Sequence, residues 1–107
     1  MQDGKVTPFR LTPARATLTI RAIAKDTGKV ILGDHALERM EQRDISDTEV
    51  YRILQVGDVL DQPVQTKLGE WKCKVVLRLK GNQSAGVVTI ILHSGLLFAK
   101  TVEWETD

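Results

Sequence analysis

The hydrophobic pattern of this chain changes its period at Gly57. Before that glycine, apolar residues recur at intervals of three and four, as on one face of an amphipathic helix. After it they alternate with polar residues, as in half-buried strands. Helical segments followed by a run of strands are typical of an α+β domain. The 107 residues, 42% of them hydrophobic, are enough for one modest core. We therefore expect residues 1–11 to form a flexible arm and residues 12–107 a single domain.

Two helices are expected directly before Gly57. The later one carries the clearest local signal, because the Ser46 hydroxyl can accept from the amide of Glu49 while the Glu49 carboxylate reaches back to Ser46. Gly57 would end that helix. The earlier helix is expected to begin at Asp34 and to run to about Gln42. The two together predict a helical hairpin.

Residues 12–28 fit two patterns. Thr12 as a cap, Pro13 at the first helical position and Gly28 as a stop favour a helix. The alternation of apolar residues with threonines around residues 18–22 favours a strand instead. We favour the helix, which would be an extra N-terminal element before the hairpin.

Short runs of apolar and β-branched residues predict the strands. The last three runs are separated by turns that contain glycine, so they are expected to form an antiparallel meander. The predicted strands are residues 29–33, 58–62, 70–80, 87–93 and 96–104.

The net charge of +1 conceals an uneven distribution along the chain. Residues 1–33 hold six cations against two acids, residues 34–62 hold three against eight, and residues 63–107 hold six against four. A protein that coats nucleic acid would be basic throughout. Any binding of a polyanion is therefore expected to be local.

The cysteine content and the apolar runs bear on where the protein works. A lone cysteine, Cys73, excludes an intramolecular disulfide and suits a reducing interior. The first residues lack an apolar run of signal-peptide length, and the longest apolar stretch, GVVTIIL, is too short to span a membrane. We expect a soluble cytoplasmic protein without a membrane partner.

His35, Arg39 and Arg43 fall at four-residue intervals on the earlier helix of the hairpin and form one slanted row beside its apolar residues. Two arginines four residues apart repel each other, so helix stability alone does not favour them. A histidine in the first turn faces the positive end of the helix dipole, which favours its neutral form. Guanidinium groups bind phosphate through two hydrogen bonds at once. The row is therefore a candidate catalytic site for a phosphate-containing substrate.

The alternative interpretation of this row is structural. The arginines would then pair with nearby acids such as Asp44, Asp47 or Asp58, and the histidine would hydrogen-bond backbone groups. The sequence leaves both interpretations open.

The strand predicted at residues 70–80 sorts its side chains by alternation. Its apolar residues point one way, and its cations form a stripe about 25 Å long on the other face. Such a stripe could follow the phosphates of RNA, or it could be a solvated outer face that protects against aggregation. The four cations are Lys72, Lys74, Arg78 and Lys80.

Other chemistry finds less support in the sequence. His35, His93 and Cys73 do not have the spacing of metal ligands, so we expect neither a metal nor a cofactor. Cys73 lies on the apolar face of its strand, where an inert core thiol is expected. No glycine-rich phosphate loop is present.

Three stretches carry a family resemblance: HALERMEQRDISDTEVYRILQVGDVLDQP, EWKCKVVLRL and LFAKTVEW. Together they resemble a bacterial family of domains of unknown function. Its hallmark is a His-Ala-x-x-Arg-Met-x-x-Arg motif, followed by a helix ending in glycine and a strand with Trp-x-Cys. The resemblance covers about residues 26–104. That family looks related to the RelE/ParE-type toxins, including the BrnT branch.

The resemblance implies a RelE-like α+β fold, in which a helical hairpin packs on a curled, mainly antiparallel sheet of four to five strands. It also implies a metal-independent endoribonuclease that activates a ribose 2′-hydroxyl and is held silent by an antitoxin protein. His35, Arg39 and Arg43 match the motif positions. The basic strand, with Lys72, Lys74 and Arg78, would be the RNA track.

This chain departs from the active toxins at its end. They usually carry basic or tyrosine residues there, whereas this sequence ends in VEWETD. A non-catalytic module on the same fold, which binds RNA or a protein, is therefore the alternative. A motif that serves only to hold the hairpin together is a third possibility.

Overall fold

The computed structural model describes residues 9–105. Residues 1–8 of the expected arm lie outside the described residues. Leu11, which was placed in the same arm, is instead buried in the core, and its carbonyl accepts a hydrogen bond from the Gln62 side chain at 2.7 Å. The core thus includes a residue that precedes the first helix.

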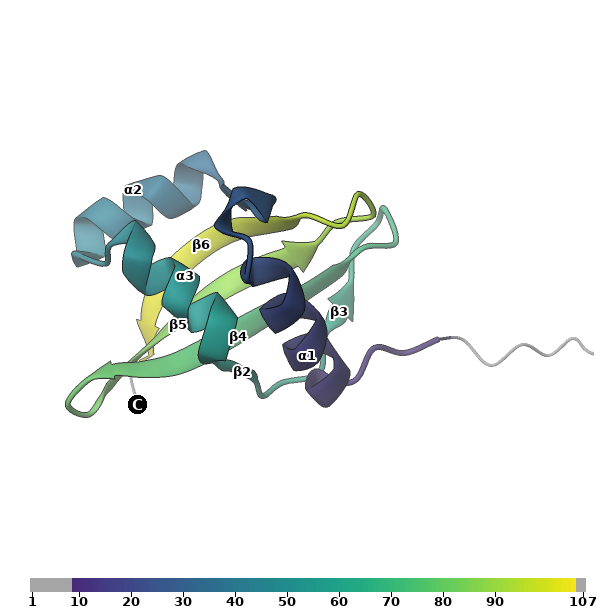
Figure 1. Ribbon diagram of the computed structural model, residues 1–107, viewed down its shortest axis with the longest axis horizontal. Coiled ribbons are helices and arrows are strands. Elements are labelled where there is room, and N and C mark those ends of the chain that lie inside the picture. The colour runs from purple at the N-terminus through teal and green to yellow at the C-terminus, as the bar shows by residue number, and fades with distance from the viewer. Residues whose placement is uncertain (1–8, 106–107) are drawn as a thin grey trace, which may run out of the picture.

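The described residues form a mixed α+β structure with three α-helices and one six-stranded, open sheet (Figure 1). The change of period at Gly57 is confirmed, because only helices, a 3₁₀ turn and one three-residue strand precede it. The elements are α1 (Pro13–Ala24), the 3₁₀ turn η1 (Thr27–Lys29), β1 (Val30–Leu32), α2 (Asp34–Arg43), α3 (Asp47–Val56), β2 (Asp58–Val59), β3 (Val64–Gln65), β4 (Trp71–Lys80), β5 (Gln83–Ile91) and β6 (Leu97–Glu105).

The strand order of the sheet is β1-β6-β5-β4-β2, and β3 also pairs with β4. All pairs are antiparallel except β1 with β6, which run parallel. The sheet has one strand more than the upper end of the expected four to five, because the two-residue strands β2 and β3 pair separately with the long strand β4. β5 begins at Gln83 rather than at residue 87, so the hairpin turn is shorter than expected.

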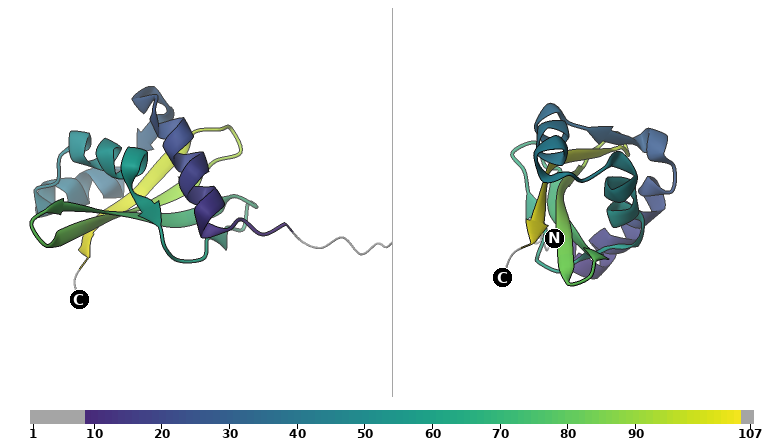
Figure 2. Two further views of the ribbon diagram at one scale, coloured as in Figure 1. Left: turned by 60° about the horizontal axis from the view of Figure 1, so that its bottom comes forward. Right: turned by 90° about the vertical axis from the view of Figure 1, so that its left-hand side faces the viewer.

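The three helices cover one face of the sheet, and no described helix covers the other (Figure 2). Helix α2 packs chiefly on β6, α3 lies over β4 and β5, and α1 packs against α3 and β2. The core lies between these two layers. Its largest fully buried side chains are Ile20, Ile53, Leu54, Leu97, Val50, Val75, Val87, Val102 and Thr89. None of the helices within residues 9–105 is long and apolar enough to cross a membrane.

Local signals account for α1. The Thr12 hydroxyl accepts from the Arg15 amide at 3.2 Å and Pro13 occupies the first turn, so the helical interpretation of residues 12–28 holds. The helix ends at Ala24, before Gly28, because η1 follows it. The Asp26 carboxylate starts η1 by accepting from the Gly28 amide at 2.9 Å.

The helical hairpin is built by a tight turn and a capping box. Asp44 ends α2 in the left-handed conformation, with φ 55°, and the Ile45 amide donates to the Met40 carbonyl at 2.9 Å. Ser46 and Glu49 then form the predicted capping box, in which each side chain accepts from the backbone amide of the other. The hairpin places α2 and α3 side by side on the sheet.

Candidate functional site

Helix α2 is joined to strand β6 at both ends. At its start, the Gly33 amide donates to the Ala99 carbonyl at 3.0 Å. A Cβ atom on Gly33 would lie 2.6 Å from the Phe98 ring and 3.1 Å from the Ala99 carbonyl oxygen, so a larger residue would have to displace the ring. At its end, the Trp104 indole N–H donates to the Arg43 carbonyl at 3.1 Å. Helix α2 therefore runs alongside residues 99–104 of β6.

This arrangement places the predicted row on one flank of α2. Ala36 and Met40 are buried against the sheet. On the helical wheel His35, Arg39 and Arg43 lie to one side of that buried pair. His35 is about half exposed, with 52% of its side chain accessible, and both arginines are partly buried. The row is thus accessible without being fully solvated.

The opposite flank of α2 faces a groove of about 460 Å³ at the α2–α3 turn. Leu37 and Glu41 of α2 line it together with Ser46 and Glu49, which begin α3. Since that flank is turned towards α3, the flank with the row is turned away from α3. In the order of the sheet, this is the side of β6 on which β1 lies.

A hydrogen-bonded chain connects the side chains of the row. Arg39 Nε lies 3.4 Å from His35 Nε2, and the Gln42 side-chain oxygen accepts from Arg39 Nη1 at 2.7 Å and from Arg43 Nη1 at 3.5 Å. Glu38 Oε1 lies 3.7 Å from His35 Nδ1. In a neutral His35, this network assigns the proton to Nδ1 and leaves Nε2 as the acceptor. Nε2 is the nitrogen that could act as a base.

Gln42 and Glu38 also belong to this cluster, although they were not among the predicted site residues. The available signal was their spacing: each lies three residues beyond a member of the row, where helical side chains are neighbours. Because Gln42 is neutral, it joins the two guanidiniums without cancelling their charge. We call His35, Glu38, Arg39, Gln42 and Arg43 the α2 cluster.

Within residues 9–105, neither Arg39 nor Arg43 has a carboxylate at ion-pair distance. Asp58, one acid that the structural interpretation named as their partner, pairs with Arg21 of α1 instead, at 3.0 Å. The positive charge of the α2 cluster is therefore not neutralised inside the described part of the chain.

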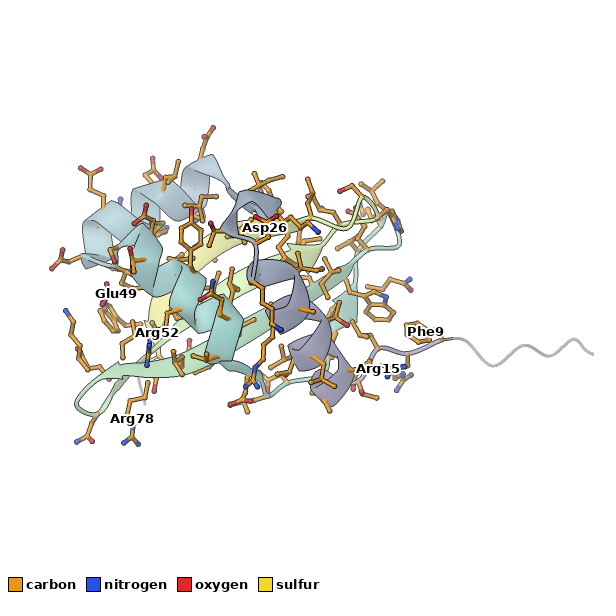
Figure 3. The ribbon with its side chains drawn as sticks, in the orientation of Figure 1. Phe9, Arg15, Asp26, Glu49, Arg52 and Arg78 are labelled. Atoms are coloured by element: carbon orange, nitrogen blue, oxygen red, sulfur yellow. The ribbon has the colours of Figure 1, made fainter. Side chains whose placement is uncertain are left out.

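The basic strand lies elsewhere. Cys73 and Val75 of β4 are buried beneath the helices, so alternation puts Lys72 and Lys74 on the uncovered face of the sheet. Arg78 is exposed, and its side chain projects away from α2 in Figure 3. The structure therefore does not bring these cations into one cleft with the α2 cluster.

Lys74 is held by two acids of β6. Its ammonium group lies 2.9 Å from Glu105 Oε1 and 3.5 Å from Glu103 Oε2, across the intervening strand β5. This contact passes over Gly86: a Cβ atom there would be 2.7 Å from Glu105 Oε2 and 3.0 Å from Lys74 Cδ. The hydrogen bond that Lys74 donates to Glu105, together with the charges of both carboxylates, raises the pKa of Lys74. The positive charge of Lys74 is thus largely neutralised by acidic side chains of the same sheet.

Lys80 departs from the predicted stripe. The pairing of β4 with β5 shifts between Arg78 and Lys80, which marks a bulge that leaves Leu79 without a partner. A bulge interrupts the alternation of side chains. Lys80 accordingly lines the groove at the α2–α3 turn, among Glu41 and Asp44. The prediction of four cations on one face is wrong at this position.

The surroundings of Cys73 and His93 indicate structural roles for both residues. Burial raises the pKa of the Cys73 thiol to about 11, which keeps it protonated and unreactive near neutral pH. A ring nitrogen of His93 lies 2.8 Å from the Leu68 carbonyl, and its backbone amide donates to Glu70. His93 thus ties two turns together. Residues 9–105 contain no cluster of three or more potential metal ligands.

A comparison with known families gives a match over most of the fold. Residues 32–104, from the end of β1 to β6, match the family model described as a domain of unknown function (DUF4258). No curated protein and no solved structure matches the chain. The matched region contains the whole α2 cluster and the basic strand, and leaves out α1. Because the match covers more than half of the sequence, the chain belongs to the DUF4258 family.

Proposed function

We propose that this protein is a toxin-like endoribonuclease that cleaves RNA without a metal ion, and that the α2 cluster is its catalytic site. The observation that carries the proposal is the pair of partly exposed guanidiniums, Arg39 and Arg43, beside an imidazole and without a carboxylate partner among residues 9–105. Such a pair suits a phosphodiester group.

The chemistry follows from the hydrogen bonds of the cluster. Arg39 and Arg43 would turn towards the phosphate oxygens and stabilise the charge that develops on them. This movement releases His35 Nε2 from Arg39 Nε, so that it can take the proton of the ribose 2′-hydroxyl. The 2′-oxygen then attacks phosphorus and forms a cyclic phosphate. The departing 5′-oxygen takes a proton from the histidine or from water.

Fold and location fit this proposal. The hairpin α2–α3 on a mainly antiparallel sheet is compatible with a RelE-like fold. A cytoplasmic location agrees with the lone thiol. A toxin of this type would need a protein antitoxin as its partner.

Purified protein and a labelled single-stranded RNA in EDTA test the proposal. Wild type should cleave the RNA to a cyclic phosphate and a 5′-hydroxyl end. Arg39→Ala should lower the rate by about 100-fold or more. Arg52→Ala is the matched control, since Arg52 is an exposed arginine of the neighbouring helix α3 (Figure 3). Equal cleavage by all three proteins, or intact RNA with wild type, would overturn the proposal.

Expression in growing cells gives a second readout. Wild type should slow growth and deplete RNA, whereas Arg39→Ala should permit normal growth. If both proteins leave growth and RNA unchanged, toxicity is excluded.

The second candidate is a non-catalytic module that binds RNA or a protein. One observation that favours it is that Lys74 forms ion pairs with Glu103 and Glu105, which neutralise part of the basic strand. The other is that the basic strand lies apart from the α2 cluster. A salt titration discriminates between the two ligands. Affinity for RNA should fall steeply with salt concentration if phosphates are bound, while a flat response indicates a protein partner.

A further inference from the structure

Two neighbouring cavities open beside Phe9, at the end of the molecule where α1 begins. The first has a volume of about 420 Å³ and is bounded by Phe9, Trp71 and the chain that enters β3. The second has a volume of about 370 Å³ and lies between Phe9 and the first turns of α1, where Arg15 lines it. Phe9 and Arg10 line both cavities, so they form the partition between them. Figure 3 shows Phe9 and Arg15 at one end of the molecule, far from Glu49.

The first cavity has two aromatic walls. The rings of Phe9 and Trp71 have centroids 6.2 Å apart and planes at 77°, so they meet as the sides of a corner. Phe9 is 71% exposed, although aromatic side chains usually bury most of their surface. A third planar ring in this corner can stack on one wall and meet the other edge to face, and both arrangements are favourable for aromatic pairs. The corner therefore fits a planar, aromatic ligand.

The first cavity also offers hydrogen-bond acceptors. Gln62 and Gln65 line it, and each donates its side-chain N–H within the protein, to the Leu11 carbonyl at 2.7 Å and to the Gly69 carbonyl at 3.2 Å. Neither side-chain oxygen accepts a hydrogen bond from another residue within 9–105. These oxygens can accept from an amino group on the edge of a planar ring. Adenine, cytosine and guanine carry such an amino group.

The second cavity supplies positive charge. Arg10 and Arg15 are exposed, and neither has a carboxylate at ion-pair distance in the part of the chain that the structure describes. Arg21, the next arginine of α1, is by contrast paired with Asp58 at 3.0 Å. Because Arg10 lines both cavities, an anion bound beside it would lie next to a ring held in the first cavity. Guanidinium groups bind phosphate through two hydrogen bonds at once.

We propose that the two cavities bind one nucleotide, with its base in the corner between Phe9 and Trp71 and its phosphate on Arg10 and Arg15. A free mononucleotide and an unstacked nucleotide of a single strand offer the same chemistry. The site lies at the opposite end of the molecule from α2 (Figure 1). Its arginines and Phe9 precede the region that matches DUF4258. The inference does not depend on the proposed ribonuclease function.

Nuclear magnetic resonance of the isotope-labelled, full-length protein tests the proposal, because the chain has two tryptophans whose indole N–H groups give separate signals. Adenosine 5′-monophosphate (AMP) should shift the signal of Trp71. It should leave the signal of Trp104 unchanged, since that indole donates to the end of α2. Adenosine, which lacks the phosphate, and ribose 5-phosphate, which lacks the base, should each bind about tenfold or more weakly.

Variants test the two cavities separately. Phe9→Ala should weaken binding of AMP about tenfold, because a stacking surface is lost. Leu60→Ala is its matched control, an exposed apolar residue outside both cavities, and should bind as wild type. Arg15→Glu should weaken binding about tenfold or more. Lys25→Glu reverses a charge at the other end of α1 and should leave the affinity unchanged.

A short strand of deoxyadenylate identifies the source of the nucleotide. It lacks the 2′-hydroxyl, so the proposed ribonuclease chemistry cannot cleave it. If the strand shifts the Trp71 signal and binds about tenfold or more tightly than AMP, the site takes a nucleotide of a strand. Equal affinity assigns the site to a free nucleotide.

Three results would overturn the proposal: an unchanged Trp71 signal with AMP, equal affinity for AMP and ribose 5-phosphate, or undiminished binding by Phe9→Ala. The second of these would leave only a patch that attracts phosphate. Arg39→Ala with Arg43→Ala should retain the shift of Trp71 by AMP. Because AMP contains no phosphodiester bond and is not cleaved, nucleotide binding can fail while the proposed ribonuclease function stands, and the reverse.

Discussion

Lys74 shows at the scale of single residues how a contact distant in sequence changes the role of a charge. Its pKa is raised by Glu105 and Glu103. A raised folded-state pKa stabilises the protein below the unfolded-state value, about 10.4 for lysine, and the stabilisation is lost as pH rises through the folded-state value. We expect wild type to lose more stability than Lys74→Met in urea unfolding as the pH rises above about 10.4. Lys72→Met should show the same dependence of unfolding free energy on pH as wild type. If Lys74→Met also shows the same dependence, Lys74 is not the group with the raised pKa.

The burial of Cys73 gives a second prediction at the residue scale. With its pKa raised to about 11, almost no thiolate is present at neutral pH. An alkylating reagent at about pH 8 should leave the native protein unmodified and label it fully in urea. Labelling of the native protein as fast as that of the unfolded protein would show that the thiol is accessible.

At the scale of the elements, α3 depends on its capping box. Ser46→Ala removes the acceptor for the Glu49 amide. This should cost about 1 kcal/mol, or roughly 4–8 °C in the melting temperature of a domain of about this size. Thr48→Ala, in the same exposed turn, should change stability by less than about 0.5 kcal/mol. A melting temperature of Ser46→Ala equal to that of wild type would exclude a role for the cap.

Two glycines test how the elements approach each other. A Cβ atom on Gly57 would lie 2.5 Å from the Ile53 carbonyl oxygen and 2.8 Å from that of Val76, both of them backbone atoms that cannot move aside. Gly57→Ala should therefore destabilise the protein by about 1–3 kcal/mol. At Gly86 the nearest atoms belong to the side chains of Glu105 and Lys74 and not to the backbone. Gly86→Ala should displace these side chains and destabilise the protein less than Gly57→Ala does. Denaturant unfolding of both variants measures the two losses, and a larger loss for Gly86→Ala would contradict this prediction.

At the scale of the whole molecule, the two sides of the sheet carry different cations. If RNA binds at the α2 cluster, Arg39→Ala with Arg43→Ala should weaken binding of single-stranded RNA. The slope of log affinity against log salt concentration should also become shallower by about 1.4, because two phosphate contacts are lost. Lys72→Ala with Arg78→Ala, on the uncovered face, should have little effect. A larger loss in this second variant, measured by the same titration, would place RNA on the uncovered face.

Features that depend on neighbours within four residues could be predicted from the sequence. The capping box of Ser46 and Glu49, the helix start at Pro13 and the change of period at Gly57 are of this kind. Each is decided by backbone hydrogen bonds or by side-chain periodicity within one element. The row formed by His35 and the arginines also follows from helical spacing alone.

Contacts between residues far apart in sequence needed the tertiary structure. Lys74 and Glu105 are 31 residues apart, and Gly86, which reads locally as part of a turn, lies inside β5 where these two side chains cross. The bulge before Lys80 and the parallel pairing of β1 with β6 depend on strand register, which no local signal specifies. The sequence therefore determined the elements and the row on α2. Only packing decided that the row lies alongside β6 and apart from the lysines.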